Sequence, residues 1–202
     1  SALYSGMVPA LIAGIDRSDV VEIDLRQLCD RAGVAFIQAE ISGLDVQRQQ
    51  LQLTNRPALT YGLLSLNVGA VSRSSNADGM AIKPLEPALA FLAAQEPNSR
   101  NPFRVVGAGS AGVEVVLALR RRWPQRPLQL QSHPNQLNNL ERHILSSADI
   151  ELIEGDDGDS SLPLLLCTGS RAPSWLGASG LPVEPDGRVR TDRYLQVQGA
   201  TN

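Results

Sequence analysis

The chain has 202 residues, of which 43% are hydrophobic and 19% charged, and its formal net charge at pH 7 is −3. This length allows one large domain or two small ones, and the composition is that of a globular protein with a buried core. A negative net charge and an aromatic content of 4% argue against a nucleic-acid binder, which would carry a basic excess and surfaces for base stacking.

The first half of the chain predicts short elements joined by turns. In chain order they are a buried segment (1–14), a helix (23–33), the two strands of a hairpin (34–46 and 51–54), a buried strand (60–70), a loop (72–79) and a helix (82–95) that begins near its second proline. Asp24 can cap the helix at 23–33 and Gly33 can stop it.

The second half alternates strand and helix. The predicted elements are a strand (103–106), a helix that ends at Pro124, a strand (127–131), a helix (138–148), a strand (150–155), an acidic loop (156–161) and a fully buried strand (162–169). This β-α-β-α-β-loop-β order predicts an α/β fold, with a parallel sheet and helices packed on its faces.

Gly107, Gly109 and Gly112 form a Gly-x-Gly-x-x-Gly motif between the predicted strand and the predicted helix. In such a motif the first glycine permits the tight turn, the second lets a diphosphate approach the backbone, and the third lets the helix lie close to the sheet. The free N–H groups near Ser110 and Ala111 would then point at anionic oxygens. The motif predicts a dinucleotide site; the alternative is a glycine-rich turn used only for packing in an α/β interaction domain.

The residues that would choose between nucleotides are missing from the second strand. An acidic residue roughly 20 positions beyond the glycines usually receives the ribose hydroxyls of NADH, but Gln131, Ser132 and His133 occupy that place, and no arginine is there for NADPH. Residues 120–122 are all arginine and close the preceding helix, where we expect them to satisfy the helix C-terminus and not a phosphate.

The remaining reactive side chains predict no further centre. Cys29 and Cys167 are far apart and the chain has no Cys-x-x-Cys, so we expect two buried thiols. His133 and His143 have no clustered partners, so we expect no metal site. No apolar run approaches the roughly 18 residues of a membrane span, and no signal peptide is recognisable.

Three other stretches resemble signatures of flavoprotein pyridine-nucleotide oxidoreductases. Residues 60–70 are similar to the first strand-turn-glycine signature, with Gly62 in place of the usual aspartate; residues 164–175 are similar to the second, with Thr168-Gly169 intact; and residues 187–199 resemble the strand before the final Gly-Asp. With YSGMVPALIAG, AIKPLEP and GAGSAGVE, nearly the whole chain resembles the type II NADH dehydrogenase-like branch, closest to the subgroup sometimes fused to selenide, water dikinase.

The resemblance implies nested Rossmann-like dinucleotide-binding domains, in which an FAD domain (1–80 and 173–202) is split by an inserted NAD(P)H domain (81–172). It implies hydride transfer from NAD(P)H to FAD and electron transfer to a quinone-like acceptor, with no disulfide as intermediary. It also implies a cytoplasmic protein, with no nucleic-acid partner, and leaves open a peripheral membrane contact and a homodimer.

The resemblance also assigns site residues. The NAD(P)H phosphates would lie on the glycine motif, Glu114 would lie near the nicotinamide, Lys83 would face the flavin with residues 4–9 lining its ring system, and Thr168 with Gly169 would form a turn near the cofactor.

Some expected family elements are absent from the sequence. The FAD domain's own Gly-x-Gly-x-x-Gly would precede Ser1, its closing Gly-Asp would follow Asn202, and the region 156–161 is short. We therefore expect a fragment with an incomplete FAD domain that is inactive alone. The alternative function is a non-catalytic NAD(H)-binding or sensing module.

Overall fold

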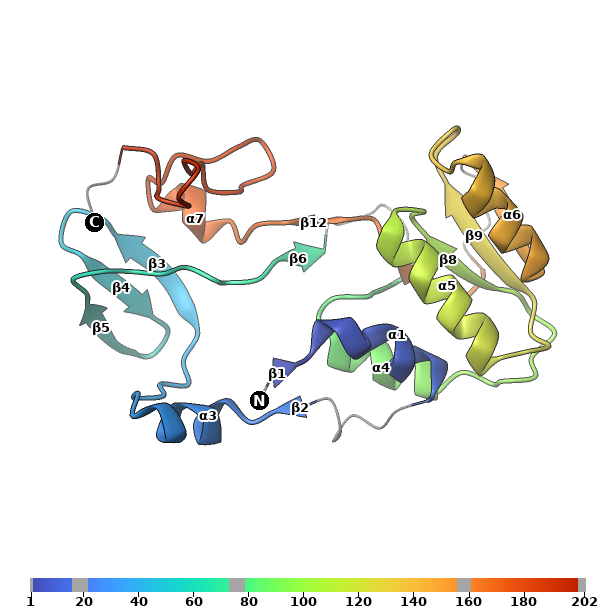
Figure 1. Ribbon diagram of the computed structural model, residues 1–202, viewed down its shortest axis with the longest axis horizontal. Coiled ribbons are helices and arrows are strands. Elements are labelled where there is room, and N and C mark those ends of the chain that lie inside the picture. Colours follow the sequence, from blue (N-terminus) through green and yellow to red (C-terminus); the bar gives the residue numbers. More distant parts are fainter. Residues whose placement is uncertain (1, 16–21, 73–78, 156–160, 200–202) are drawn as a thin grey trace. The chain divides into compact units, whose positions relative to one another are not determined.

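The computed structural model describes residues 2–15, 22–72, 79–155 and 161–199, which fall into two compact units (Figure 1). The first unit consists of Ser1–Val34 and Ser72–Gly169, and the second of Ala35–Val71 and Ser170–Asn202. Both units are therefore built from segments distant in the sequence.

A five-stranded parallel sheet forms the centre of the first unit. Its spatial order is β10 (Ile150–Glu154), β9 (Leu128–Ser132), β8 (Phe103–Val106), β11 (Leu164–Leu166) and β7 (Met80–Ala81). Every neighbouring pair is parallel. The helices α4 (Leu85–Ala93), α5 (Ser110–Arg122) and α6 (Asn139–Ser147) connect successive strands. The predicted alternation of strand and helix is confirmed, and the strand order reverses beside β8, with β9 and β10 on one side and β11 and β7 on the other.

Local signals fix the helix ends. In α6 the Asn138 side chain accepts from the Glu141 N–H and the Glu141 carboxylate accepts from the Asn138 N–H, which is a complete capping box. The predicted start of α4 near Pro87 is wrong by about half a turn, because Pro84 stands at the N-cap and the helix begins at Leu85.

The core lies on one face of the sheet. Alternate strand residues of that face join one apolar cluster with residues of all three helices; its strand members include Phe103, Val105, Leu128, Leu130, Ile150 and Leu165. The opposite face carries a hydrogen-bonded row, in which Arg104 donates to Gln129 at 2.9 Å and Gln129 donates to Glu151 at 2.8 Å. The predicted packing of helices on the sheet is therefore observed on the face that carries the apolar cluster, where residues of α4, α5 and α6 all take part.

The N-terminal segment belongs to the first unit. After the short strand β1 (Ala2–Leu3) and a 3-10 turn at Ser5–Met7, α1 (Val8–Ala13) packs against α5, with Ile12 fully buried. Strand β2 (Glu22–Ile23) pairs with β1 and leads into α3 (Leu25–Ala32). The predicted ends of α3 are confirmed, since Asp24 accepts from the Gln27 N–H and Gly33 ends the helix at a φ of 66°.

The second unit contains an antiparallel sheet of β3 (Ile41–Asp45), β4 (Gln50–Leu53) and β5 (Arg56–Thr60), together with α7 (Trp175–Ala178). The predicted hairpin is confirmed, although its first strand begins at Ile41 and not at Val34, and β5 is an addition. Short strands β6 (Val71–Ser72) and β12 (Ser170–Arg171) pair with each other.

Two strand predictions in this unit are wrong. Residues 61–70 form no strand; alternate side chains, among them Leu64 and Leu66, pack on an apolar cluster but the backbone has no ladder partner. Residues 187–199 make only isolated bridges, because the Asp186 and Asp192 carboxylates accept from nearby backbone N–H groups and form turns.

The predicted loops at 72–79 and 156–161 lie mostly outside the described residues. Within the described ranges, no helix has the length and apolar character needed to cross a bilayer.

Candidate nucleotide site

The predicted site residues gather at the carboxyl edge of the parallel sheet. Gly107 directly follows β8, Thr168 and Gly169 follow β11, and Lys83 follows β7. Because the strands are parallel, their C-terminal ends meet at one edge, beside the point where the strand order reverses. Open α/β sheets bind ligands at such a point.

Gly107 is held tightly between two neighbouring strands. Its φ is +103°, a conformation that side chains rarely adopt, and its N–H donates to the Gln131 carbonyl at 2.9 Å. A Cβ at Gly107 would stand 2.5 Å from the Cys167 oxygen and 3.1 Å from the Thr168 nitrogen. The structure therefore brings the glycine turn and the predicted Thr168 turn into direct contact.

Gly112 lets helix α5 begin immediately after this turn. A Cβ at Gly112 would be 1.8 Å from the Gly107 carbonyl oxygen and 3.5 Å from the Cys167 Cβ. Any side chain here would push the helix away from the strand it follows.

Gly109 differs from both of these glycines. Its φ of −70° and ψ of 174° suit any residue, and a Cβ there would meet nothing within 4 Å. It is exposed, as are Ser110 and Ala111. The fold itself does not require a glycine at this position. The lack of a side chain leaves space for a ligand to approach the backbone closely.

The N-terminus of α5 is free to receive an anion. Gly109 is its N-cap and no side chain among the described residues caps it. The first intrahelical bond runs from the Val113 N–H to the Gly109 carbonyl, so the N–H groups of Ser110 to Gly112 have no partner within the helix. These donors, together with the positive end of the helix dipole, suit a phosphate group.

The other predicted site residues differ in how close they lie to the glycine turn. Glu114 is exposed on α5, just beyond its first turn. Gly169 has a φ of +89° and continues the turn after Thr168. Lys83 is exposed and lies two strands from Gly107, roughly 10 Å by ordinary strand spacing. The structure thus groups Thr168 and Gly169 with the glycines but does not bring Lys83 into contact with them.

Ser132 also lies at this edge of the sheet. From the sequence it was notable only because it occupies a position where an acidic residue is usual. It ends β9, next to Gly107, and is 4% exposed. Its Oγ has no hydrogen-bond partner among the residues that the structure describes. An unmade hydrogen bond at a buried polar atom is uncommon and calls for an explanation.

Two of the three arginines that close α5 bind backbone carbonyls at the other end of the helix. Arg120 donates to five backbone carbonyls, those of Trp123, Pro124, Arg126, Ala148 and Asp149. Arg122 donates to the Ile12 carbonyl. Arg120 lies about 15 Å along the helix from Ser110, at about 1.5 Å per residue. The expectation that these arginines satisfy a helix C-terminus is confirmed for Arg120, whereas Arg122 binds a carbonyl of α1 and Arg121 is exposed.

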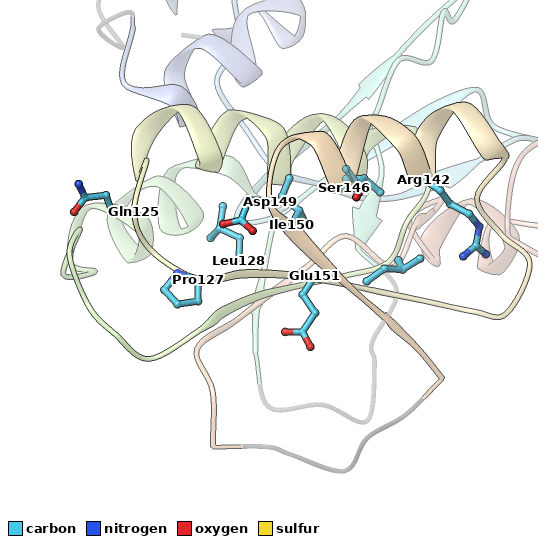
Figure 2. Close-up of a pocket in the computed structure, with 10 residues that line it drawn as sticks. Gln125, Pro127, Leu128, Arg142, Ser146, Asp149, Ile150 and Glu151 are labelled. Atoms are coloured by element: carbon cyan, nitrogen blue, oxygen red, sulfur yellow. The ribbon is translucent and has the colours of Figure 1, made fainter.

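A cavity of about 520 Å³ lies elsewhere, at the amino edge of β9 and β10 (Figure 2). Figure 2 shows Pro127 and Leu128 at the start of β9 and Asp149 and Ile150 at the start of β10, with Arg142 contributed by α6. The cavity shares no residue with the glycine turn. Since it belongs to the opposite edge of the sheet, it does not bear on the predicted site.

Cys167 is packed into the base of the turn. It is buried, its N–H donates to the Val106 carbonyl at 2.7 Å, and burial raises the pKa of its thiol to about 12. A thiol held neutral in this way is a poor nucleophile.

Comparison with known proteins shows the fold. No family model and no curated protein matches the chain. Among solved structures, it is similar to putidaredoxin reductase in its covalent complex with putidaredoxin (TM-score 0.79, 17% identity, 96% of this chain and 55% of that chain). It is also similar to a water-forming NADH oxidase from Lactobacillus brevis bound to NADH (TM-score 0.78, 14% identity, 96% of this chain and 51% of that chain). A third similar structure is NADH:rubredoxin oxidoreductase from Clostridium acetobutylicum (TM-score 0.73, 14% identity, 90% of this chain and 53% of that chain).

The chain therefore spans about half the length of these oxidoreductases. The expected α/β, Rossmann-like dinucleotide-binding fold is confirmed. At these low identities the similarity extends to the fold and not to the activity.

Proposed function

We propose that the chain binds NAD(P)H at the Gly107–Gly112 turn, as part of an FAD-dependent NAD(P)H oxidoreductase. The observation that carries the proposal is Gly109, a glycine with open space before it at the uncapped mouth of α5. A side chain there would cost the fold nothing, but it would obstruct a diphosphate. The similar NADH oxidase structure, which contains NADH, supports the same reading.

In the proposed arrangement the diphosphate lies on the N–H groups of Ser110, Ala111 and Gly112. The adenosine lies toward the end of β9, where Rossmann sites receive the ribose. The nicotinamide then extends the other way, past Glu114 toward Thr168 and Gly169. These donors are fixed by the backbone, so they hold the ligand without the entropy cost of ordering long side chains.

For the whole protein we propose electron transfer from the nicotinamide through flavin to a quinone-like acceptor. The sequence motifs support the type II NADH dehydrogenase-like branch and its subgroup fused to selenide, water dikinase. Similarity to putidaredoxin reductase and to NADH:rubredoxin oxidoreductase supports electron transfer as the class of reaction. The proposed domains are 1–80 and 173–202 for FAD and 81–172 for NAD(P)H, with Lys83 facing the flavin.

The residues of this chain fit NAD(P)H better than they fit FAD. The 202 residues contain a single Gly-x-Gly-x-x-Gly, and the nicotinamide nucleotide occupies it in the proposal. The described residues supply no second cradle of this kind for the FAD diphosphate. FAD, when bound, would accept the hydride and pass on electrons; this chain's own residues bind and orient the nicotinamide nucleotide.

A second candidate function is a non-catalytic NAD(H)-binding or sensing module, for which the Gly107–Gly112 motif suffices. Both candidates share the nucleotide site and differ only in redox chemistry. Binding of NAD(P)H by the chain supports either, whereas reduction of a quinone by the flavin-loaded whole protein supports the first alone.

The direct test is titration of the 202-residue chain with NADH and NADPH, followed by nucleotide fluorescence and calorimetry. We expect saturable binding of at least one nucleotide, competed by ADP, because ADP carries the same diphosphate. If neither nucleotide binds, the glycine turn serves packing alone and the proposed function is wrong.

A further inference from the structure

The end of β9 lies directly beside the glycine turn. Val106 is in register with Gln131, and the Gly107 N–H donates to the Gln131 carbonyl at 2.9 Å. Ser132 is the next residue, so it stands level with the turn. In Rossmann sites a carboxylate near this point accepts from the ribose hydroxyls, or an arginine nearby binds a 2′-phosphate.

Ser132 faces the side of the sheet that α5 covers. Strand residues alternate between faces, and Leu130 and Leu128, which lie two and four residues before Ser132, belong to the core shared with α5. The Ser132 Oγ is buried and has no partner in the described part of the chain. Rotation of this side chain toward the strand end would therefore break no hydrogen bond, and a hydroxyl can either donate or accept.

The charges around this strand end are compensated. Glu154 of β10 is in register with Ser132, but its carboxylate is ion-paired with Arg142 of α6. The Gln131 side-chain amide donates to the Gly155 carbonyl at 2.8 Å. The adjacent side chain toward solvent is the exposed His133. The described residues here offer neither a free carboxylate to repel a 2′-phosphate nor a free cation to attract one.

We propose, resting on the proposed nucleotide site, that Ser132 and His133 make this chain bind NADH and NADPH with nearly equal affinity. The two nucleotides differ only at the 2′ position of the adenosine ribose, which carries a hydroxyl in NADH and a phosphate in NADPH. The Ser132 hydroxyl can accept a hydrogen bond from the 2′-hydroxyl of NADH and can donate one to the 2′-phosphate of NADPH. Selectivity in Rossmann sites comes from a charged side chain at this position, and the described residues at the end of β9 supply no uncompensated charge.

The test compares dissociation constants of NADH and NADPH for the 202-residue chain at pH 8 and fixed ionic strength. We expect the two constants to agree within about threefold, which is under 1 kcal/mol. The His133→Glu variant should bind NADPH about tenfold more weakly than NADH, and the His133→Arg variant should show the opposite preference.

His143 provides the matched control, because it is an exposed histidine that belongs to α6 and not to the end of β9. His143→Glu and His143→Arg should leave the NADH to NADPH ratio unchanged. A wild-type preference of more than about 30-fold for either nucleotide would overturn the inference while leaving the nucleotide site intact. Equal shifts from the His143 and His133 variants would also overturn it, and failure to bind either nucleotide would overturn the proposed function as well.

Discussion

Gly112 lies so close to Gly107 that a Cβ on Gly112 would stand 1.8 Å from the Gly107 carbonyl oxygen. Within the same motif, a Cβ on Gly109 would meet nothing within 4 Å. The motif thus contains glycines that the fold requires and one that the fold does not. Stability and nucleotide affinity should therefore respond to substitution at different positions.

Gly112→Ala should lower the free energy of unfolding by about 2–4 kcal/mol, because the obstructing atom is backbone and cannot swing aside. Urea denaturation measures this change. Gly177→Ala is the matched control, since Gly177 is also helical and its Cβ would be 3.4 Å from a Val183 methyl group. The control should be neutral or mildly stabilising. A loss below about 0.5 kcal/mol at Gly112 would contradict the close approach seen in the turn.

Gly109→Ala should leave the thermal midpoint unchanged or slightly raised, because alanine adopts this backbone conformation and restricts the unfolded chain. The same methyl group should weaken NADH and NADPH binding about tenfold or more, since it occupies the approach to the α5 amides. Gly62→Ala, at another open glycine, should change neither property. An unaltered affinity in the Gly109 variant would place the diphosphate elsewhere.

The sequence predicted the first unit well because its signals are local and periodic. Gly33 and Asp24 define α3, Pro124 follows the end of α5, and the alternation after residue 103 predicts parallel strands. The strand β8, the glycines and α5 then follow from adjacent residues alone. Such a unit can be read from sequence because each element's boundaries are encoded within a few positions.

The second unit was harder because its pattern comes from tertiary packing. Leu64, Leu66 and Val68 alternate as strand residues do, yet they pack on a small cluster without a ladder partner. The strand β5 was missed since Pro57 stands within it, and proline usually argues against a strand. Whether an extended segment becomes a strand depends on a neighbour far along the chain.

At the site, the sequence identifies Gly107, Gly109 and Gly112 and assigns a role to each, but it does not say which neighbouring atoms surround them. At Gly107 the nearest of those atoms belong to Cys167, which follows β11 and lies more than fifty residues along the chain. The unpartnered hydroxyl of Ser132 likewise depends on packing around β9. Contacts between segments far apart in the sequence determine the surroundings of Gly107 and of the Ser132 hydroxyl, and a local sequence pattern does not predict such contacts.

Arg120→Ala should destabilise the chain without altering nucleotide affinity. The guanidinium donates to carbonyls at the ends of α5 and α6, and its loss leaves several of them unsatisfied. We expect a loss of about 2–3 kcal/mol of unfolding free energy in urea titration. The exposed neighbour Arg121 serves as the control, and Arg121→Ala should be close to neutral. Weaker NADPH binding by folded Arg120→Ala would instead implicate Arg120 in phosphate contact.

Cys167 and Cys29 should differ in reactivity. Burial raises the pKa of the Cys167 thiol to about 12, from an ordinary value of 9.0. Cys29 is only half-buried, so the prediction of two buried thiols is confirmed for Cys167 and wrong for Cys29. Iodoacetamide at pH 8 should therefore modify Cys29 in the native chain and both cysteines in urea, as peptide mass spectrometry would show. Equal labelling of the two native cysteines would contradict the packing of Cys167 beneath the glycine turn.

The raised pKa of Cys167 also sets the sign of a pH dependence. Between about pH 9 and 12 the unfolded chain loses the thiol proton while the folded chain keeps it, so the unfolding free energy falls as pH rises. The slope from this group is at most about 1.4 kcal/mol per pH unit, and below pH 9 it vanishes. Cys167→Ala should lower stability at pH 7 by opening a cavity, yet remove this component of the slope, whereas Cys29→Ala should retain it. Denaturation curves of the three proteins from pH 7 to 11 measure the difference, and parallel pH profiles for wild type and Cys167→Ala would show that the thiol is not buried in the folded chain.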